Sequence, residues 1–526
     1  MSKNIIPTEP CGATPKNACK TIADAVRVAE SSSDANHTIT LHGDKEGQLE
    51  QQSCHVVSST ISLSNNYYFT SYNGTRACIT TTGSVIPAFK IATSVTFKLT
   101  KVNFKGISIL IGISEKKDCS PNSSFSNVEI SDVTVRDTWF VHPIKWYIRS
   151  LVDLACAVAQ INNVKFVNLG DSHTKYTQTY YLFRFKDTQG VVKNLILENS
   201  IISGVLFIWS SSIVIDNVHF VNSTVHKDIL QVPVVALKTD LRVSGMHFRN
   251  SNIHKVLSVY ARKWKKINVH IENLSSIGNN TVDILVNHYL SGIITFKDVI
   301  FNGTAYDEAF IRGSEKSSIS LENVLFEKIH PKIDDPLNYR NIIETYGDIV
   351  LNNVTIRKSE YLVGIKLGGG FVGGLANITA RDVYMVGNIG YGHLSLSRFS
   401  VATMSNIYID NTEYRDRVSY EWNSVGIGCS SESIRIKNFD LRLRSGHQAC
   451  LVIGYNDCAQ KFQDLANVTC PDKYHPVSMR KGFVYKYECT TCKKMEVNAS
   501  TKATESSVYL TVLTFISLIF CQQAPH

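Results

Sequence analysis

The eight residues Ile319-Ser320-Leu321-Glu322-Asn323-Val324-Leu325-Phe326 decide the fold of this chain. Apolar and other side chains alternate from Ile319 to Leu321, as in a β-strand that buries one face. The alternation then breaks, because the polar residue Asn323 directly precedes the apolar residue Val324. Such a break of phase predicts a corner between two strands.

The same phrase occurs thirteen times between residues 97 and 443. Successive copies are on average about 28 residues apart, and internal repeats of this length are typical of solenoid proteins. Lys101 and Gly245 hold the polar position in two copies, and Asn or Asp holds it in the other eleven. Those eleven residues are Asp132, Asn163, Asn194, Asn217, Asn273, Asp298, Asn323, Asn353, Asp382, Asn406 and Asn438.

Each repeat is expected to form one coil of short strands lying on the coil before it. Strand pairing is then parallel, and equivalent side chains stack about 4.8 Å apart. We expect the Asn/Asp column to face the interior at the corner and to form hydrogen bonds along the axis, because buried polar groups need partners. Helical repeats are the competing interpretation, but the alternation and the Ile, Val and Phe content favour strands. The sequence therefore predicts an all-β solenoid.

This pattern resembles the right-handed parallel β-helix, or pectin-lyase-like, superfamily, which is known for stacked asparagine ladders. The stretch from Pro10-Cys11-Gly12 to Val26 is also similar to the opening of extracellular members, where a short helix caps the first coil. The resemblance covers roughly residues 10 to 455 and implies such a capping helix. Its expected apolar stripe consists of Ile22, Ala25, Val26, Val28 and Ala29.

The pattern changes after the last repeat. Cys470-Pro471-Asp472-Lys473-Tyr474, followed by Cys489-Thr490-Thr491-Cys492, is similar to the small ephrin-receptor-like cysteine module, although Lys473 replaces the usual Gly. We predict four parts of the chain: an N-terminal segment with the capping helix (1–37), the parallel β-helix (38–455), a cysteine-rich module (456–500), and a polar spacer with a hydrophobic tail (501–526).

Cysteines gather near the two ends of the predicted solenoid. None lies between Cys156 and Cys429, so disulfides are expected where the coils have least packing support. Buried free thiols are the alternative, and a zinc site of Cys470, Cys489, Cys492 and His475 is less favoured on grounds of compartment. We predict no metal and no cofactor. The disulfide candidates are Cys11, Cys19, Cys54, Cys78, Cys119, Cys156, Cys429, Cys450, Cys458, Cys470, Cys489 and Cys492.

Eleven Asn-X-Ser/Thr sequons point to the secretory pathway. Two of them, Asn273 and Asn353, fall on the ladder that we expect to face inward, so we predict no glycan there. The predicted glycosylation sites are Asn36, Asn73, Asn122, Asn222, Asn279, Asn302, Asn377, Asn467 and Asn498.

The two termini bear on how the protein is held at a membrane. Residues 508–521 are apolar but shorter than the roughly 20 residues that a membrane-spanning helix needs. With small residues at 498–500 and a polar spacer, they resemble a GPI-anchor signal. A truncated transmembrane helix and a hydrophobic terminal strand are the alternatives. The first residues lack an apolar signal-peptide core, and we expect a missing leader.

Catalysis was sought in the motifs of polygalacturonase-like members of the superfamily. Their motifs run in the order Asn-Thr-Asp, Asp-Asp, Gly-His-Gly, Arg-Ile-Lys, so that two carboxylates flank a glycosidic bond. Here Arg435-Ile436-Lys437, Asp334-Asp335 and His393 are present, but Asn411-Thr412-Glu413 follows the acidic pair and the histidine instead of preceding them. We therefore predict no catalytic residue.

Binding residues are predicted in two insertions and one basic run. The insertions carry aromatic rings that suit sugar rings or a protein partner, and the basic run suits sulfated or acidic glycans. The alternatives are rings packed onto the solenoid wall and a solvated turn. The candidates are Trp139, Trp146, Tyr147, Tyr176 and Tyr180 in the insertions and Arg262, Lys263, Lys265 and Lys266 in the run.

These features predict a non-enzymatic extracellular or cell-surface protein used for adhesion or recognition. Its expected partners are glycans or another surface protein, with membrane attachment through the tail. The net charge of +9 over 526 residues is too mild to call for nucleic acid. A polysaccharide-degrading hydrolase or lyase is the first alternative, and a structural coat protein is the second. Outward carboxylates stacked on adjacent coils would favour the enzyme.

Overall fold

The computed structural model describes residues 11 to 490 apart from a set of short gaps. These gaps are 12–16, 46–53, 73–74, 83–86, 108–109, 114–118, 120–124, 141–148, 172–179, 234–237, 261–265, 289–291, 333–339, 369–375, 398, 415–424, 429–432, 444–451, 456–465, 470–474 and 482–483.

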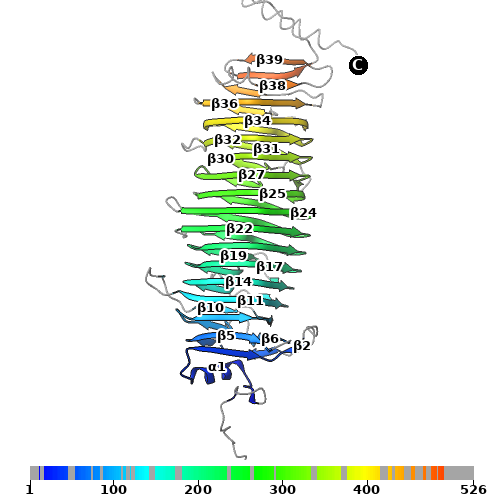
Figure 1. Ribbon diagram of the computed structural model, residues 1–526. Coiled ribbons are helices and arrows are strands. Elements are labelled where there is room, and N and C mark those ends of the chain that lie inside the picture. Colours follow the sequence, from blue (N-terminus) through cyan, green and yellow to red (C-terminus); the bar gives the residue numbers. More distant parts are fainter. Residues whose placement is uncertain are drawn as a thin grey trace, which may run out of the picture.

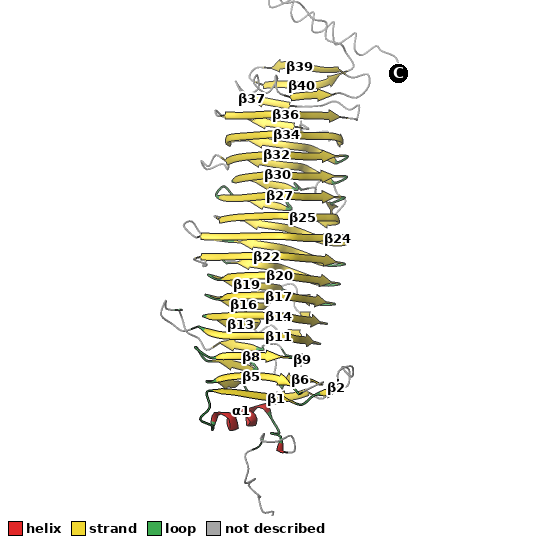
Figure 2. Cartoon of the chain, in the orientation of Figure 1, coloured by secondary structure: helices red, strands yellow, loops and turns green. Residues whose placement is uncertain are grey.

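The described residues form one elongated stack of coils, with α1 at one end and β39 at the other (Figure 1). Almost all regular structure is strand (Figure 2). Apart from β2, β39 and β40, the strands pair in parallel with their equivalents in neighbouring coils, as in Ile319↔Ile349 and Val324↔Val354. The predicted all-β parallel β-helix is confirmed.

Three parallel sheets surround one apolar core, and two corners separate the first sheet from the second and the second from the third. Most strands that begin in the first sheet continue through the first corner into the second. The strands that begin in the first sheet are, in chain order, β1 (Asn36–Leu41), β5 (Asn66–Ser71), β8 (Thr96–Thr100), β11 (Ser126–Arg136), β14 (Ala157–Val167), β17 (Gln189–Glu198), β20 (Ser212–Val221), β22 (Lys238–Arg249), β24 (Lys266–His288), β25 (Gly292–Tyr306), β27 (Ser317–Glu327), β30 (Asp348–Arg357), β32 (Ala376–Val386), β34 (Phe399–Tyr414) and β36 (Ser433–Leu443).

The third sheet lies after the second corner and closes each coil. Its strands are β4 (Ile61–Leu63), β7 (Phe89–Ile91), β10 (Ile111–Ile113), β13 (Arg149–Ala155), β16 (Tyr180–Lys186), β19 (Gly204–Trp209), β21 (Thr224–Val232), β23 (Asn252–Val259), the end of β24, β26 (Ile311–Gly313), β29 (Ile343–Thr345), β31 (Glu360–Gly368), β33 (Ile389–Ser397), β35 (Val425–Gly428) and β37 (Val452–Tyr455).

The remaining strands are short or lie at the ends of the stack. The second sheet begins with β3 (Cys54–Val57), β6 (Thr75–Thr81) and β9 (Val102–Lys105), and β38 (Ala466–Thr469) is its last described strand. The others are β2 (Asp44–Lys45), β12 (Trp139–Phe140), β15 (Gly170–Asp171), β18 (Ile201–Ile202), β28 (His330–Pro331), β39 (His475–Lys481) and β40 (Val484–Thr490).

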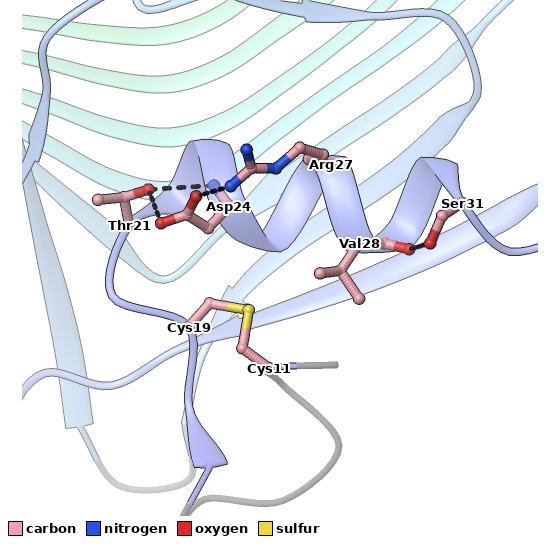
Figure 3. The surroundings of a disulfide bond; sticks show 7 residues. All are labelled: Cys11, Cys19, Thr21, Asp24, Arg27, Val28 and Ser31. Atoms are coloured by element: carbon pink, nitrogen blue, oxygen red, sulfur yellow. Dashed lines mark hydrogen bonds and ion pairs between the residues drawn. A yellow bond between two sulfur atoms is a disulfide. The ribbon is translucent and has the colours of Figure 1, made fainter. Parts of the chain in front are cut away.

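The expected capping helix is α1 (Ile22–Glu30), which buries Ile22 and Val26 against the first coil. The Thr21 hydroxyl accepts a hydrogen bond from the Asp24 N–H (3.0 Å) and so satisfies one of the free donors at the helix start. Figure 3 shows this cap beside the Cys11–Cys19 disulfide, with Arg27 paired to Asp24 on the same helix. The helix thus covers an end that would otherwise expose core side chains.

The predicted break of phase is a left-handed backbone corner. In every repeat the polar position has a positive φ, for example 54° at Asn323, 53° at Asp298 and 68° at Gly245. Asn and Asp tolerate this conformation better than other residues with a Cβ, and Gly adopts it freely. The left-handed residue swings its own side chain outward, so Glu322 and Asn323 both face solvent while Leu321 and Val324 are buried.

The ladder prediction was right about the contacts and wrong about the side. Asn323 Nδ2 donates to Asp298 Oδ1 (2.8 Å), and Asn353 Nδ2 donates to Asn323 Oδ1 (2.9 Å), so the amides do bond along the axis. These side chains lie on the outer surface, however, and both Asn273 and Asn353 are exposed. We predicted no glycans at Asn273 and Asn353 because we expected their side chains to face the interior, and this reason is therefore wrong.

The polar ladder of the interior is built from hydroxyl groups at the second corner, which the sequence analysis missed. Five residues after the first corner, φ is positive again, as at Asn199 and Asn222. The next residue then points inward. Ser223 is 2% exposed; its Oγ donates to the Val221 carbonyl (2.8 Å) and accepts from the Ser200 N–H (3.2 Å) of the preceding coil.

Three disulfides are present among the described residues, and they use all six cysteines predicted near the N-terminus. Cys11 is joined to Cys19, Cys54 to Cys78, and Cys119 to Cys156. Cys54 and Cys78 are directly opposite on the paired strands β3 and β6, so this bond joins two adjacent coils. Of the other candidates, Cys489 belongs to β40 but its side chain is not described, and Cys429, Cys450, Cys458, Cys470 and Cys492 lie outside the described residues.

The C-terminal end of the stack carries an antiparallel hairpin. Strand β38 still pairs in parallel with β36, so solenoid pairing extends into the range predicted for the cysteine-rich module. Strands β39 and β40 pair antiparallel with each other, and β40 pairs antiparallel with β37. The hairpin thus covers one edge of the final coil. The four residues of β38 are too short to show the eight-residue phrase, which explains the earlier boundary at residue 455.

The left-handed corner predicts different outcomes for two substitutions of Asn323. Asn323→Leu should destabilise the fold by about 1–2 kcal/mol, because a side chain that has a Cβ but forms no local hydrogen bond is strained at positive φ. Asn323→Gly removes the same ladder bonds but keeps the conformation accessible, so it should cost a few tenths of a kcal/mol. Thermal unfolding of the two variants measures the difference. Equal destabilisation would show that the amide bonds, not the backbone, make Asn necessary.

The interior hydroxyl ladder predicts that removing one buried serine hydroxyl destabilises the fold. Ser223→Ala should cost about 1–3 kcal/mol, because it leaves the buried Ser200 N–H without its acceptor. Ser320→Ala, on the outward side of the first sheet, is the matched control and should leave the unfolding temperature nearly unchanged. A neutral Ser223→Ala variant would remove the hydroxyl ladder as a stabilising feature.

Candidate functional site

The outward side of the third sheet carries one side chain per coil in a continuous row. The strand residues before this row, such as Leu206, Leu257 and Val286, belong to the core, so the next side chain points to the opposite face. We call the row the outer row. Strand register places in it Asp153, Arg184, Phe207, Gln231, Ser258, Asn287, Arg312, Glu344, Lys366 and Ser395.

An Arg–carboxylate pair stands near one end of the outer row. Arg184 donates from Nε to Asp153 Oδ1 (2.8 Å), and its terminal nitrogen lies 2.6 Å from Oδ2. Such a forked pair fixes both side chains. Burial raises the pKa of the Asp153 carboxyl, and the charge of Arg184 opposes that rise. Farther along the same strands, Lys186 Nζ lies 5.0 Å from the ring centre of Trp209, which places an aromatic face on this side.

The middle of the outer row is held by buried hydrogen bonds. The Ser258 hydroxyl donates to Asp228 Oδ1 (2.6 Å), and the Tyr181 hydroxyl donates to the Gln231 side-chain oxygen. Asp228 is 4% exposed, and burial raises the pKa of its carboxyl, an effect that the Ser258 bond opposes. Burial also raises the pKa of Tyr181 well above its usual range. These groups order the wall and are not themselves accessible to a large ligand.

Three donors converge on Glu344 in the next part of the row. Tyr346 donates its hydroxyl to Oε1 (2.5 Å), Lys366 Nζ donates to the same oxygen (3.1 Å), and Asn341 Nδ2 donates to Oε2 (2.9 Å). Burial acts to raise the pKa of Glu344, but these hydrogen bonds outweigh it and hold that pKa below its ordinary value. Arg312 stands opposite Glu344 in the preceding coil and is exposed. The cluster therefore places Lys366, held by Glu344, and the exposed Arg312 on neighbouring coils beside solvent.

A second polar group lies at the side of the third sheet, near the second corner. His254 Nδ1 is 3.0 Å from Asp283 Oδ2, and Lys332 Nζ is 3.6 Å from Asp283 Oδ1. The Asp283 side chain is 9% exposed, whereas about a third or more of His254 and of Lys332 reaches solvent. A carboxylate bonded to Nδ1 favours the imidazole tautomer with a free Nε2, which is the arrangement of a general base.

Only part of the predicted binding set falls on described residues. Tyr180 is 3% exposed within the core, so its ring cannot stack on a ligand, and this candidate is corrected. Trp139 begins β12 and Lys266 begins β24, but their side chains are not described. Lying outside the described residues are Trp146, Tyr147, Tyr176, Arg262, Lys263 and Lys265.

The two aromatic insertions do emerge from adjacent coils, as expected. The first begins after β12 and the second after β15, and these strands pair as Trp139↔Gly170. They end at β13 and β16, which pair as Arg149↔Tyr180.

The polygalacturonase-like motif has no counterpart on the described surface. His393 is fully buried, its Nδ1 lies 2.8 Å from the Tyr361 hydroxyl, and burial lowers its pKa to about 3. Ile436 faces the core between exposed Arg435 and Lys437, as the repeat predicts. Asp334 and Asp335 lie outside the described residues. Over the described part of the chain, no three His, Cys, Asp or Glu residues are grouped to hold a metal ion.

Sequence comparison identifies no relative: no family model matches the chain, and no curated protein matches it. Among solved structures, the chain is similar to one described as a new PL6 alginate lyase complex with trisaccharide. The identity is 10%, the match covers 88% of each chain, and the TM-score is 0.30. A likeness at this level carries no argument about activity. Within the described residues, no helix is long and apolar enough to cross a membrane.

The Glu344 cluster predicts a pH-dependent contribution to stability. A carboxyl with a lowered folded-state pKa stabilises the fold above its ordinary pKa of 4.5, and this contribution is lost as the pH falls through the lowered value. We expect Glu344→Gln to unfold at a lower temperature than the wild type at neutral pH. The difference in unfolding temperature between Glu344→Gln and the wild type should narrow below pH 4.5.

Glu322→Gln, on the exposed face of the first sheet, is the matched control and should behave like the wild type at both pH values. A gap between Glu344→Gln and wild type that stays constant on acidification would mean that the Glu344 carboxylate charge does not stabilise the fold.

Proposed function

We propose that this protein is an extracellular recognition protein that binds an acidic polysaccharide along the outer row of the third sheet. The observation that carries the proposal is the outer row itself, in which nine of the ten side chains are polar or charged, with Phe207 as the exception and with Ser258 and Asn287 buried. Each coil advances by about 4.8 Å, which is comparable to one sugar residue of an extended polysaccharide. The spacing of side chains along the outer row can therefore match the spacing of sugar residues along the polysaccharide.

The charge of the accessible groups favours an acidic ligand. The carboxylates Asp153 and Glu344 are already paired with Arg184 and Lys366, whereas Arg312, in the coil next to Glu344, is exposed. A guanidinium recognises a carboxylate or sulfate with two parallel hydrogen bonds. The net charge of +9 acts in the same direction by raising the local concentration of anionic chains.

The extracellular assignment has independent support. Three disulfides in the described residues fit an oxidising compartment, where such bonds persist. The eleven sequons fit the same route through the cell. The apolar segment 508–521 is proposed as the membrane attachment, through a lipid anchor.

Electrophoresis through gels that contain alginate, pectate, heparin or neutral dextran tests this function. The purified protein should be retarded by at least one acidic polysaccharide and not by dextran, and added salt should weaken the retardation. Arg312→Ala should raise the Kd about ten- to a hundredfold, because a hydrogen bond to a charged group contributes about 1.5–3 kcal/mol.

Arg435→Ala, which removes an exposed arginine from the first sheet, is the matched control and should bind as the wild type does. If the two substitutions weaken polysaccharide binding equally, the effect comes from overall charge, and the outer row is excluded as the binding site.

A polysaccharide-degrading enzyme is the second candidate, favoured by the His254–Asp283 pair with Lys332 beside it. The pair can accept a proton, and Lys332 can offset a substrate carboxylate. An assay for reducing or unsaturated ends, run on the same polysaccharides, separates the two functions. Retention without release of ends identifies a recognition protein. Release that disappears in His254→Ala, with binding retained, identifies the enzyme.

A further inference from the structure

The sequons that fall on described residues lie on two of the three sides of the solenoid. Asn36 and Asn377 belong to the first sheet, Asn273 and Asn353 to the first corner, and Asn302 to the second sheet. Asn222 occupies the second corner, and Asn279 follows its Gly278. Asn467 is in β38, which pairs with the second-sheet part of β36. Asn73, Asn122 and Asn498 lie outside the described residues.

Most of these described side chains can carry an oligosaccharide. Asn36, Asn222, Asn279 and Asn377 are exposed. In N-glycosylation, Nδ2 bonds to the anomeric carbon of a lipid-linked oligosaccharide, the carbon–oxygen bond to its diphosphate breaks, and one amide proton leaves. The second amide hydrogen stays.

The first-corner ladder is compatible with this modification. Asn353 Nδ2 uses a single hydrogen to donate to Asn323 Oδ1 (2.9 Å), and its side chain is exposed. A glycan can therefore replace the other hydrogen and project into solvent while the ladder bond remains. The same exposure holds for Asn273.

The third sheet has no such site anywhere in its strands. None of the eleven sequons falls between the bounds of β4, β7, β10, β13, β16, β19, β23, β26, β29, β31, β33, β35 or β37, or in the third-sheet parts of β21 and β24. This face is also the one that carries the outer row, with Arg312, Glu344 and Lys366 in register on successive coils.

We propose that N-linked glycans on the first and second sheets and their corners leave the third sheet as a wall without glycans, the bare wall, and that the acidic polysaccharide lies on the part of it where the outer row is exposed, at Arg312 and Lys366. The inference rests on the proposed function for the identity of the ligand. The glycan coat then acts as a steric guide: bulky chains on the other two sides hinder approach there and leave the outer row accessible.

Glycopeptide mass spectrometry of the protein secreted from eukaryotic cells tests the coat. Glycans are expected at Asn222, Asn279, Asn353 and Asn377. A protein without glycans at these positions would overturn the proposal, whatever its binding.

An added sequon tests the bare wall. Arg312→Asn creates a sequon with Gly313 and Ser314 in the middle of the outer row, and Arg242→Asn creates one with Val243 and Ser244 on the exposed first sheet. Both replace one exposed arginine and add one glycan. The glycosylated Arg312→Asn protein should lose retardation in the acidic gels, and the glycosylated Arg242→Asn protein should keep it.

Two controls separate the glycan from the lost charge. Arg312→Gln should bind about tenfold more weakly than the wild type but still measurably, and Arg312→Asn combined with Ser314→Ala, which has no sequon at this position, should bind at that level. Equal retention of the two glycosylated variants would overturn the bare wall as the docking face. A wild-type protein that binds no polysaccharide would contradict the proposed function. The predicted glycan positions are tested separately, by the mass spectrometry described above.

Discussion

One left-handed residue at each corner is the constraint on which the rest of this structure depends. It turns the strand without a loop, and it resets the alternation so that apolar side chains enter the core on both sides of the turn. Because the coils turn at equivalent places, parallel pairing continues from β1 to β38, interrupted by register shifts in four strand pairs. Stacked Asn amides outside and Ser hydroxyls inside then satisfy polar groups that such tight turns would leave unpaired.

The sequence predicted the coil but not the direction of its polar ladder. The neighbours Asn323 and Val324 reveal a break of phase, whereas the sign of φ at Asn323, which decides where its side chain points, is not visible in the alternation. The second corner escaped notice for another reason. Its residues range from Asn222 to Lys358 and Gly387, so no single residue type marks it. The buried Ser223 and Ser251 that follow it looked like ordinary loop residues.

The candidate site was even less accessible to sequence analysis. Arg312, Glu344 and Lys366 are separated by 22 to 32 residues and are three different residue types, and only strand register brings them together. Tyr180 was predicted to be an exposed binding residue because it lies at the end of an insertion. It is instead the first residue of β16, and its ring packs in the core. What connects fold and function is therefore the regular rise of the coils, which turns scattered residues into a row that a polymeric ligand can follow.

Hydroxyl-radical footprinting with the acidic polysaccharide that retards the protein most tests the central claim, that the third sheet carries the ligand. Tyr346 beside the outer row and Tyr384 on the second sheet, 37% exposed, are internal reporters in the same molecule. We predict that ligand lowers the oxidation of Tyr346 and leaves that of Tyr384 unchanged. Protection of Tyr384 with unchanged oxidation of Tyr346 would contradict the account.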